Sequence, residues 1–216
     1  MQAQRYLYAI VDSLPSRWRP SPNGVGGGVV TAHGVRDLVL VASPVGLPPA
    51  RNPRAEACHH DILAGLLDAG AVVPFPFGTV VGDSELASWL EARWSRICSA
   101  VDHLRGRIEM NVRLLRLDSR APANEGAAAL LRGVAERLVE RAGLAAWRYA
   151  PTGHGANVAA SVAFLVPREE VPAFLARIAP VAARVPDVAV VPTGPWPAYS
   201  FAPPLEEPAP TMAASA

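Results

Sequence analysis

The 216 residues are enough for one large domain or two small ones, and the hydrophobic share of 50% excludes a disordered chain. The formal net charge of +1 argues against a nucleic-acid-binding surface and against a polybasic membrane arm. All 20 basic residues are Arg, which excludes enzymes that need a P-loop Lys, a Schiff-base Lys or a Lys general base.

Strand-forming runs alternate with helical patterns in the first half of the chain. Aromatic and β-branched residues predict strands at 6–11 and 35–42, and the nearly continuous apolar character of 35–42 places that strand in the interior of a sheet. The segment 71–77 is apolar but contains two prolines, so we expect it at a sheet edge.

Two helices are expected around these strands. The first begins with Asn52 as its N-cap and Pro53 in its first turn, and it ends at Gly70. The second is capped by Asp83 and ends at Gly106. Its apolar residues recur with helical period: Leu86, Trp89, Leu90, Ile97, Val101 and Leu104.

From residue 107 onward a separate pattern begins. It predicts, in order, a strand at 108–117, a helix at 124–141, strands at 144–149 and 157–166, a helix at 169–184 and a strand at 187–192. Asn124 caps the first of these helices, whose inward side chains are Leu130, Leu131, Val134 and Leu138, and Pro180 breaks or bends the second.

The order β-α-β-β-α-β is that of a ferredoxin-like domain. We therefore expect an α+β fold of two domains. Residues 1–105 form an N-terminal α+β domain, residues 106–202 form a ferredoxin-like C-terminal domain, and residues 203–216 form a disordered tail.

No pattern in the sequence points to a catalytic, cofactor or metal site. The glycine-rich loop 24–28 has neither a strand before it nor a helix after it, as a phosphate loop requires. In the run Cys58, His59, His60 and Asp61, consecutive side chains on a helix diverge by about 100° and cannot share one ion. We therefore expect His59 and His60 to lie on the surface of a helix. The sequence has no G-x-S-x-G nucleophile elbow, and we predict that the protein is not an enzyme.

The location that the sequence favours is the cytoplasm. Cys58 and Cys98 are too few for a disulfide scaffold, and both are expected to be half-buried. The first residues lack the apolar stretch of a signal peptide. The continuous apolar run 156–166 is about half the length that a membrane crossing needs, so no membrane span is expected.

Two aromatic segments stand out, VVPFPFGT at 72–79 and GPWPAYSF at 194–201. Pro195 and Pro197 restrict the backbone on both sides of Trp196, so the indole is carried by a stiff segment. Such a segment is either a latch packed between domains or an anchor for a partner. We expect the latch, and with it a largely buried Trp196. The candidate partner-binding or latch residues are Phe75, Phe77, Trp196, Tyr199 and Phe201.

Taken in order, several segments resemble the gas vesicle protein F/L family (GvpF/GvpL). The matching segments are RYLYAIV at 5–11, the pair His60 and Asp61, VVPFPFGTVV at 72–81, the spaced Gly106, Glu109 and Val112, and GPWPAYSF at 194–201. The matches run collinearly from residue 5 to about residue 202. The chain departs from the family pattern at Asp61, which replaces Glu, at Pro76, which replaces Arg, and at Ala198, which replaces Pro.

The resemblance implies a non-enzymatic role as a minor gas vesicle component or assembly factor. Such proteins associate with the small, hydrophobic shell protein GvpA and with other accessory gas vesicle proteins, so the expected location is the cytoplasm, at the vesicle. The family's two α+β domains, the second ferredoxin-like, agree with the pattern above. The alternative is an unrelated ferredoxin-like small-ligand module or enzyme.

The resemblance does not identify the binding surface. The low net charge and the proline-containing apolar segment 72–77 favour an apolar surface or an exposed sheet edge over a charged patch. Binding of this kind should survive high salt, and Phe75→Asp is expected to disrupt it.

Overall fold

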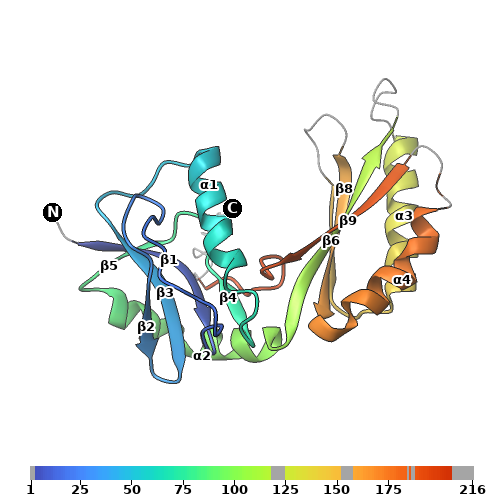
Figure 1. The fold of residues 1–216 in the computed structure, drawn as a ribbon. Helices are drawn as coiled ribbons and strands as arrows, with labels where there is room; N and C mark the ends of the chain where they lie inside the picture. The colour runs from blue at the N-terminus through green and yellow to red at the C-terminus, as the bar shows by residue number, and fades with distance from the viewer. Residues whose placement is uncertain (1–2, 118–124, 152–157, 184, 186–187, 206–216) are drawn as a thin grey trace, which may run out of the picture.

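The computed structural model describes residues 3–117, 125–151, 158–183, 185 and 188–205. These residues form two antiparallel sheets, each packed against helices, in an α+β fold of two domains (Figure 1). The long helix α2 (Leu86–Leu104) leads from the N-terminal domain directly to the first strand of the second sheet, β6 (Arg107–Arg116).

The N-terminal sheet is built around the strand β1 (Gln4–Val11). The other strands are β2 (Thr31–Val35), β3 (Leu38–Val45), β4 (Val72–Pro74) and β5 (Val80–Gly82). They lie in the order β2-β3-β1-β4, and β5 also pairs with β1. The first predicted strand and the edge position of the 71–77 segment are thereby confirmed.

A β-bulge divides the side chains of β1 between two layers. The register with β3 shifts between Leu7 and Ala9, so Leu7 and Ile10 face the same cluster although they are three residues apart. That cluster contains the buried side of α2, whereas Tyr6 and Tyr8 face the opposite cluster, beneath the helix α1 (Pro53–Ala64). The sheet is therefore covered on both faces.

The predicted strand 35–42 was placed a few residues too early, because its first residues belong to a hairpin and only 38–42 lie in β3. β2 ends at Val35, and β3 begins at Leu38 after a tight turn in which Arg36 has a φ of 54°. Neither residue of this turn is Gly or Asn, so the usual hairpin signal is missing from the sequence. The interior position of β3 is confirmed, because it lies between β2 and β1.

The helix boundaries were only partly predicted. The side chain of Asn52 accepts a hydrogen bond from the Ala55 amide, which confirms the cap of α1, but the helix ends at Ala64, before the predicted Gly70. The predicted cap of α2 is wrong. Asp83 instead forms an ion pair with Arg5 at 2.7 Å, and α2 begins without a side-chain cap.

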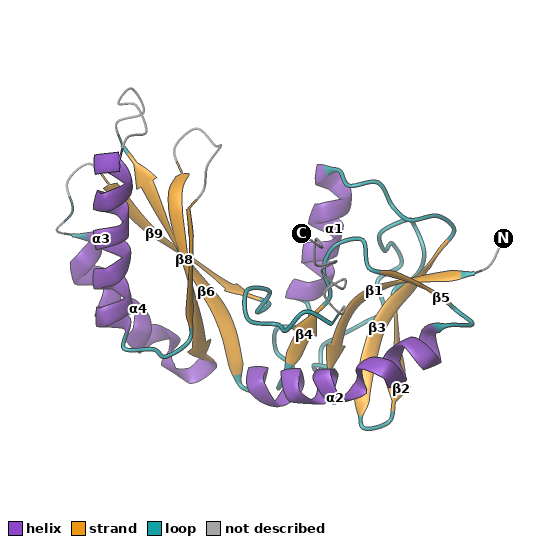
Figure 2. Cartoon of the chain, turned by 180° about the vertical axis from the view of Figure 1, so that it is seen from behind, coloured by secondary structure: helices purple, strands orange, loops and turns teal. Residues whose placement is uncertain are grey.

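The C-terminal sheet has the order β7-β8-β6-β9, which is the ferredoxin-like arrangement that the sequence predicts. Its remaining elements are α3 (Glu125–Ala142), β7 (Trp147–Pro151), β8 (Val158–Pro167), α4 (Val171–Ala182) and β9 (Val188–Trp196). A short 3-10 turn, Arg168–Glu170, leads into α4. Both helices lie on one face of the sheet (Figure 2).

Several details of this domain differ from the prediction. Leu130, expected to point inward, is 46% exposed. The helix α4 is not broken at Pro180 but continues to Ala182, because the proline removes only the hydrogen bond that its own amide would have donated, near the end of the helix. The strand β9 extends four residues beyond its predicted end at Pro192. The proposed cap Asn124 lies outside the described residues.

The proposed domain boundary near residue 105 falls between the end of α2 and the start of β6. Leu205 belongs to the predicted tail, yet its side chain is buried in the N-terminal core. The rest of that tail, 206–216, lies outside the described residues. None of the described helices is long and apolar enough to cross a membrane.

Candidate functional site

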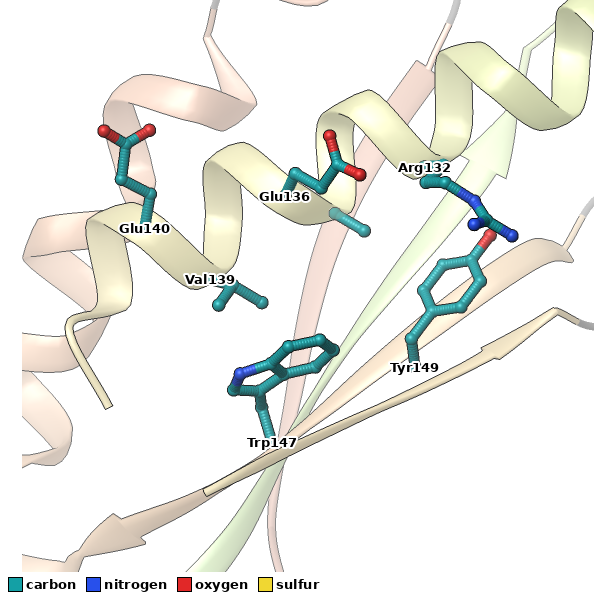
Figure 3. Close-up of a pocket in the computed structure, with 7 residues that line it drawn as sticks. Arg132, Glu136, Val139, Glu140, Trp147 and Tyr149 are labelled. Atoms are coloured by element: carbon teal, nitrogen blue, oxygen red, sulfur yellow. The ribbon is translucent and has the colours of Figure 1, made fainter. Parts of the chain in front are cut away.

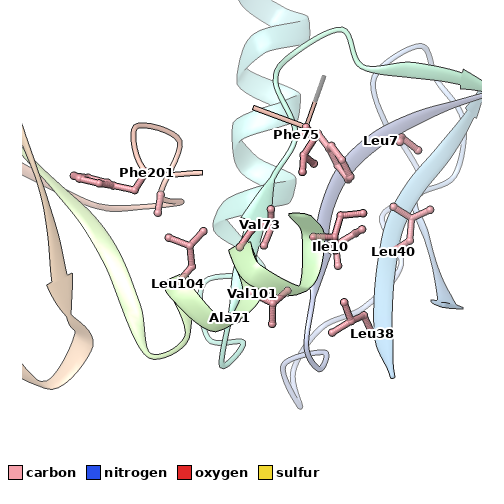
Figure 4. Close-up of a cluster of buried hydrophobic side chains, with 14 of the residues drawn as sticks. Leu7, Ile10, Leu38, Leu40, Ala71, Val73, Phe75, Val101, Leu104 and Phe201 are labelled. Atoms are coloured by element: carbon pink, nitrogen blue, oxygen red, sulfur yellow. The ribbon is translucent and has the colours of Figure 1, made fainter. Parts of the chain in front are cut away.

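The candidate site is the junction at which the end of the chain returns to the N-terminal domain. The strand β9 ends at Trp196, and residues 197–205, which we call the C-terminal segment, then run from the second sheet to the first domain (Figures 1 and 2). Ala198, Phe201 and Leu205 are buried in the cluster that β1 and α2 form (Figure 4). The C-terminal segment therefore completes the core of the N-terminal domain, although the whole second domain lies between them in the sequence.

The second domain also contributes to this junction. Ala163 and Leu165 of β8 are buried in the same cluster as the C-terminal segment. Arg168, which follows β8, donates a hydrogen bond from Nη2 to the Ala69 carbonyl of the N-terminal domain at 3.0 Å. The apolar cluster and the hydrogen bond together fix the two domains against each other.

A histidine at the centre of the junction joins three elements. His59 lies on α1 with only 1% of its surface exposed. Its Nδ1 is 2.9 Å from the hydroxyl of Tyr6 on β1, and its Nε2 is 2.8 Å from the hydroxyl of Tyr199 in the C-terminal segment. The Tyr6 hydroxyl also accepts a hydrogen bond from the Gly78 amide. Both ring nitrogens therefore have partners, as buried polar groups require.

Aromatic rings surround this imidazole. The ring of Tyr8 stacks on His59 with centroids 5.7 Å apart, and Phe77 meets His59 edge-on at the same distance. Burial, together with the neighbouring His60, lowers the pKa of His59 to about 4. Burial raises the pKa of Tyr6 to about 12 and raises that of Tyr199 as well. All three groups are therefore neutral at pH 7, and the enclosed imidazole cannot reach a substrate as a general base.

A buried carboxylate fixes the same segment to the second domain. Glu109 on β6 accepts hydrogen bonds from the Ser200 amide at 2.8 Å and from the Ser200 hydroxyl at 2.9 Å. Burial raises the pKa of Glu109, while the two bonds from Ser200 act in the opposite direction. The consecutive residues Tyr199 and Ser200 therefore bond to different domains, Tyr199 to His59 of the first and Ser200 to Glu109 of the second.

The five candidate residues of the sequence have different environments. Phe75 is 1% exposed and Phe201 7% exposed, and both belong to the core cluster (Figure 4). Phe77 and Tyr199 are half-buried beside His59. The side chain of Phe75 is therefore not exposed for contact with a partner in this structure.

The expected burial of Trp196 is wrong. The indole is 45% exposed, and its Nε1 donates to the hydroxyl of Thr193 on its own strand at 3.3 Å. The chain turns toward the first domain only after Trp196, so the next residues, Pro197 and Ala198, take the buried positions. The two prolines restrict the backbone on both sides of Trp196 but allow the indole to point either into the protein or into solvent. The sequence alone therefore does not predict whether Trp196 is buried.

Two residues of the junction were missed in the sequence. His59 was expected on the helix surface, although it lies four residues before the buried Leu63 and so on the same face of α1. That spacing was the available signal. Glu109 was part of a family motif, but nothing local to it indicated a bond with Ser200.

The cysteines and histidines do not form a metal cluster in the part of the chain that the structure describes. Cys58 and Cys98 are both half-buried free thiols, as expected. Among the described residues, no group of three or more His, Cys, Asp or Glu side chains could hold a metal ion.

The comparison with protein families decides the affiliation. The family model described as "Gas vesicle synthesis protein GvpL/GvpF" matches residues 4–126 and 116–203. The chain belongs to the GvpL/GvpF family. A search of curated proteins gave no significant match.

Two crystal structures share the fold of this GvpL/GvpF family member. The gas vesicle protein GvpF from Anabaena sp. PCC7120 matches with a TM-score of 0.77 and 16% identity, over 93% of this chain and 96% of that one. GvpF from Microcystis aeruginosa matches with a TM-score of 0.70 and 13% identity, over 93% of this chain and 99% of that one.

Proposed function

We propose that this protein acts in gas vesicle formation, as an assembly factor or minor component that binds the hydrophobic shell protein GvpA and other accessory gas vesicle proteins in the cytoplasm. The observation that carries this proposal is the family match across residues 4–203. A polymerising shell protein with a large apolar face needs a partner that covers this face before assembly. An unrelated ferredoxin-like module or enzyme is not supported, because the matched family is one of gas vesicle proteins.

The surface that best fits an apolar partner is a groove between α4 and the edge strand β9. Its volume is about 590 Å³, and all of its lining residues are apolar: Leu175, Ile178, Ala179, Ala182, Ala183, Val190 and Pro192. Val191 and Trp196 on the same edge strand are also exposed. Pro192 and Pro195 remove backbone donors from β9, which disfavours uncontrolled pairing of this edge with other strands. Side-chain contacts would therefore carry the binding.

The test is a pull-down of the shell protein after co-expression, with washes at low and high salt. Ala179→Glu places a charge in the groove, and we expect it to abolish retention, because burying an unpaired carboxylate opposes apolar contact. Ala176→Glu is the matched control, since Ala176 is exposed on the same helix outside the groove. Retention should survive high salt, because screening does not weaken apolar contact. Equal retention of both variants would contradict the proposed groove, and no retention of the shell protein by the unmodified chain would contradict the proposed function.

A further inference from the structure

A second groove lies at the opposite edge of the C-terminal sheet, between α3 and β7. It has a volume of about 360 Å³ (Figure 3). Its lining residues are Arg132, Ala135, Glu136, Val139, Glu140, Trp147 and Tyr149. Trp147 and Tyr149 come from β7, two positions apart, so both rings stand on the sheet face that α3 covers. The indole of Trp147 is 40% exposed.

The charged side chains of this groove follow one line along α3. Arg132, Glu136 and Glu140 are spaced by four residues, so they lie on one face of the helix, and all three are exposed. In Figure 3 Arg132 lies beside Tyr149, and the two glutamates follow toward the Trp147 end. Neither glutamate forms an ion pair with another described residue. At the Trp147 end of the groove, α3 thus carries two carboxylates that have no ion-pair partner among the described residues, and in Figure 3 both extend to the side of the helix away from the indole.

The strand beside this groove has a free edge. β7 is the terminal strand of its sheet as far as the structure describes it, with β8 as its neighbour. The Leu165 amide donates to the Ala146 carbonyl, and hydrogen-bonded pairs alternate along an antiparallel ladder. The backbone groups of Trp147 and Tyr149, one and three positions further, therefore point away from β8. The Trp147 carbonyl already accepts a hydrogen bond from Nη1 of Arg148 at 3.0 Å. The Trp147 amide and the backbone groups of Tyr149 have no partner among the described residues and are available to an added strand.

We propose that the α3/β7 groove binds an extended segment of a protein partner, which adds as a strand to β7 and places two basic side chains, two positions apart, along Glu136 and Glu140. Side chains on one face of a strand repeat every ~6.6 Å, and helix positions four residues apart are ~6 Å apart. The exposed indole of Trp147, at the same end of the groove, offers its face to a cation. The negative charge of the two glutamates and the distance between them thus both favour an extended segment with two basic side chains two positions apart.

The charges around the groove are compatible with this occupant. The nearest Arg on the strand, Arg148, points to the opposite face, where its guanidinium lies 5.4 Å from the ring centroid of Phe201. Arg132 lies at the far end of the line, two helical turns from Glu140. The groove between α4 and β9 differs, because it has no charged lining residue and because β9 carries prolines within the strand, whereas the proline of β7, Pro151, is its last residue. This proposal is independent of the binding of the shell protein.

The test is a titration of the purified chain with a fluorescein-labelled, end-capped heptapeptide of valine and threonine that contains two arginines two positions apart, followed by fluorescence anisotropy. We expect saturable binding that weakens with salt. The double variant Glu136→Gln with Glu140→Gln should weaken binding about tenfold, as two exposed charge pairs are lost. Trp147→Ala should weaken it by a similar factor. The matched control is Glu85→Gln with Glu169→Gln, which removes two exposed carboxylates elsewhere on the surface.

Two further peptides separate strand addition from simple charge attraction. A peptide with both arginines replaced by glutamate should not bind. A peptide that keeps the arginines but has prolines at alternate positions lacks backbone donors, and it should bind at least several-fold more weakly. Absence of binding by the arginine peptide, equal binding by the glutamate peptide, equal binding by the proline peptide, or equal weakening in the control double variant would each overturn the proposal.

Discussion

The hydroxyl of Tyr199 lies 2.8 Å from Nε2 of His59, although 140 positions separate the two residues. The next residue, Ser200, donates two hydrogen bonds to Glu109 of the other domain. Two consecutive residues near the end of the chain therefore hold both domains, one through a buried imidazole and the other through a buried carboxylate. The first predictions concern these two bonds.

Tyr199→Phe should lower the free energy of unfolding by about 1–3 kcal/mol, because it leaves a buried nitrogen of His59 without a partner. Urea denaturation at pH 7 is the measurement. Tyr149→Phe is the control, since Tyr149 is half-buried on β7 and its hydroxyl makes no hydrogen bond with a described residue. Equal losses in the two variants would show that the bond to His59 does not stabilise the fold.

The pKa of His59, lowered from 6.5 to about 4, predicts a loss of stability in acid. Below pH 6.5 the unfolded chain binds a proton at this residue, whereas the folded chain does so only near pH 4. The free energy of unfolding should therefore fall as the pH falls through this window, by about 3 kcal/mol in full.

The measurement is the unfolding free energy of the protein and of His59→Gln at a series of pH values between 7 and 4. The variant should lose less stability on acidification, because it has no imidazole to protonate. Other titrating groups, including Glu109 with its raised pKa, are common to both proteins and cancel in the comparison. Parallel pH profiles would mean that His59 is not buried as described.

Two substitutions of Glu109 should differ in their effects. Glu109→Gln keeps an acceptor for Ser200 and removes a charge whose ionisation burial opposes, so stability at pH 7 should change little. Glu109→Ala leaves the Ser200 amide unpaired and should cost about 1–3 kcal/mol. Thermal and urea unfolding of both variants distinguish the two outcomes. A larger loss for the Gln variant would show that the negative charge itself stabilises the junction.

Phe201→Ala should cost about 3–5 kcal/mol, because the ring is 7% exposed within the core cluster. Trp196→Ala should cost less than about 1 kcal/mol, because the indole is 45% exposed. The comparison of the two by urea unfolding shows which aromatic residue acts as the latch. The reverse order would place Trp196 between the domains after all.

The sequence predicted those parts of the fold that depend on local patterns. The β-α-β-β-α-β order of the second domain followed from its apolar runs, and the cap at Asn52 followed from residue type and spacing. The turn at Arg36 was missed because it has no Gly or Asn, and β5 was missed because three residues give no periodicity. The Asp83 cap failed because an ion pair with Arg5, distant in sequence, takes its carboxylate.

The junction was less predictable, because its bonds join distant parts of the chain. The aromatic segment that contains Tyr199 and Phe201 was identified from its composition, but the direction of each side chain depends on where β9 ends. The bond from Tyr199 to His59 leaves no local pattern at either residue. The two grooves of the second domain arise where helices meet edge strands, and sequence periodicity does not measure how completely such an edge is covered.

The C-terminal segment has a consequence for the order in which the chain matures during synthesis. The cluster around β1 and α2 receives Ala198, Phe201 and Leu205 only after the whole ferredoxin-like domain has been translated. Domains commonly fold in the order in which they leave the ribosome. Here all strands of the ferredoxin-like sheet have been synthesised before the last residues of the N-terminal core are available. The domain that is synthesised first is therefore the last to complete its core.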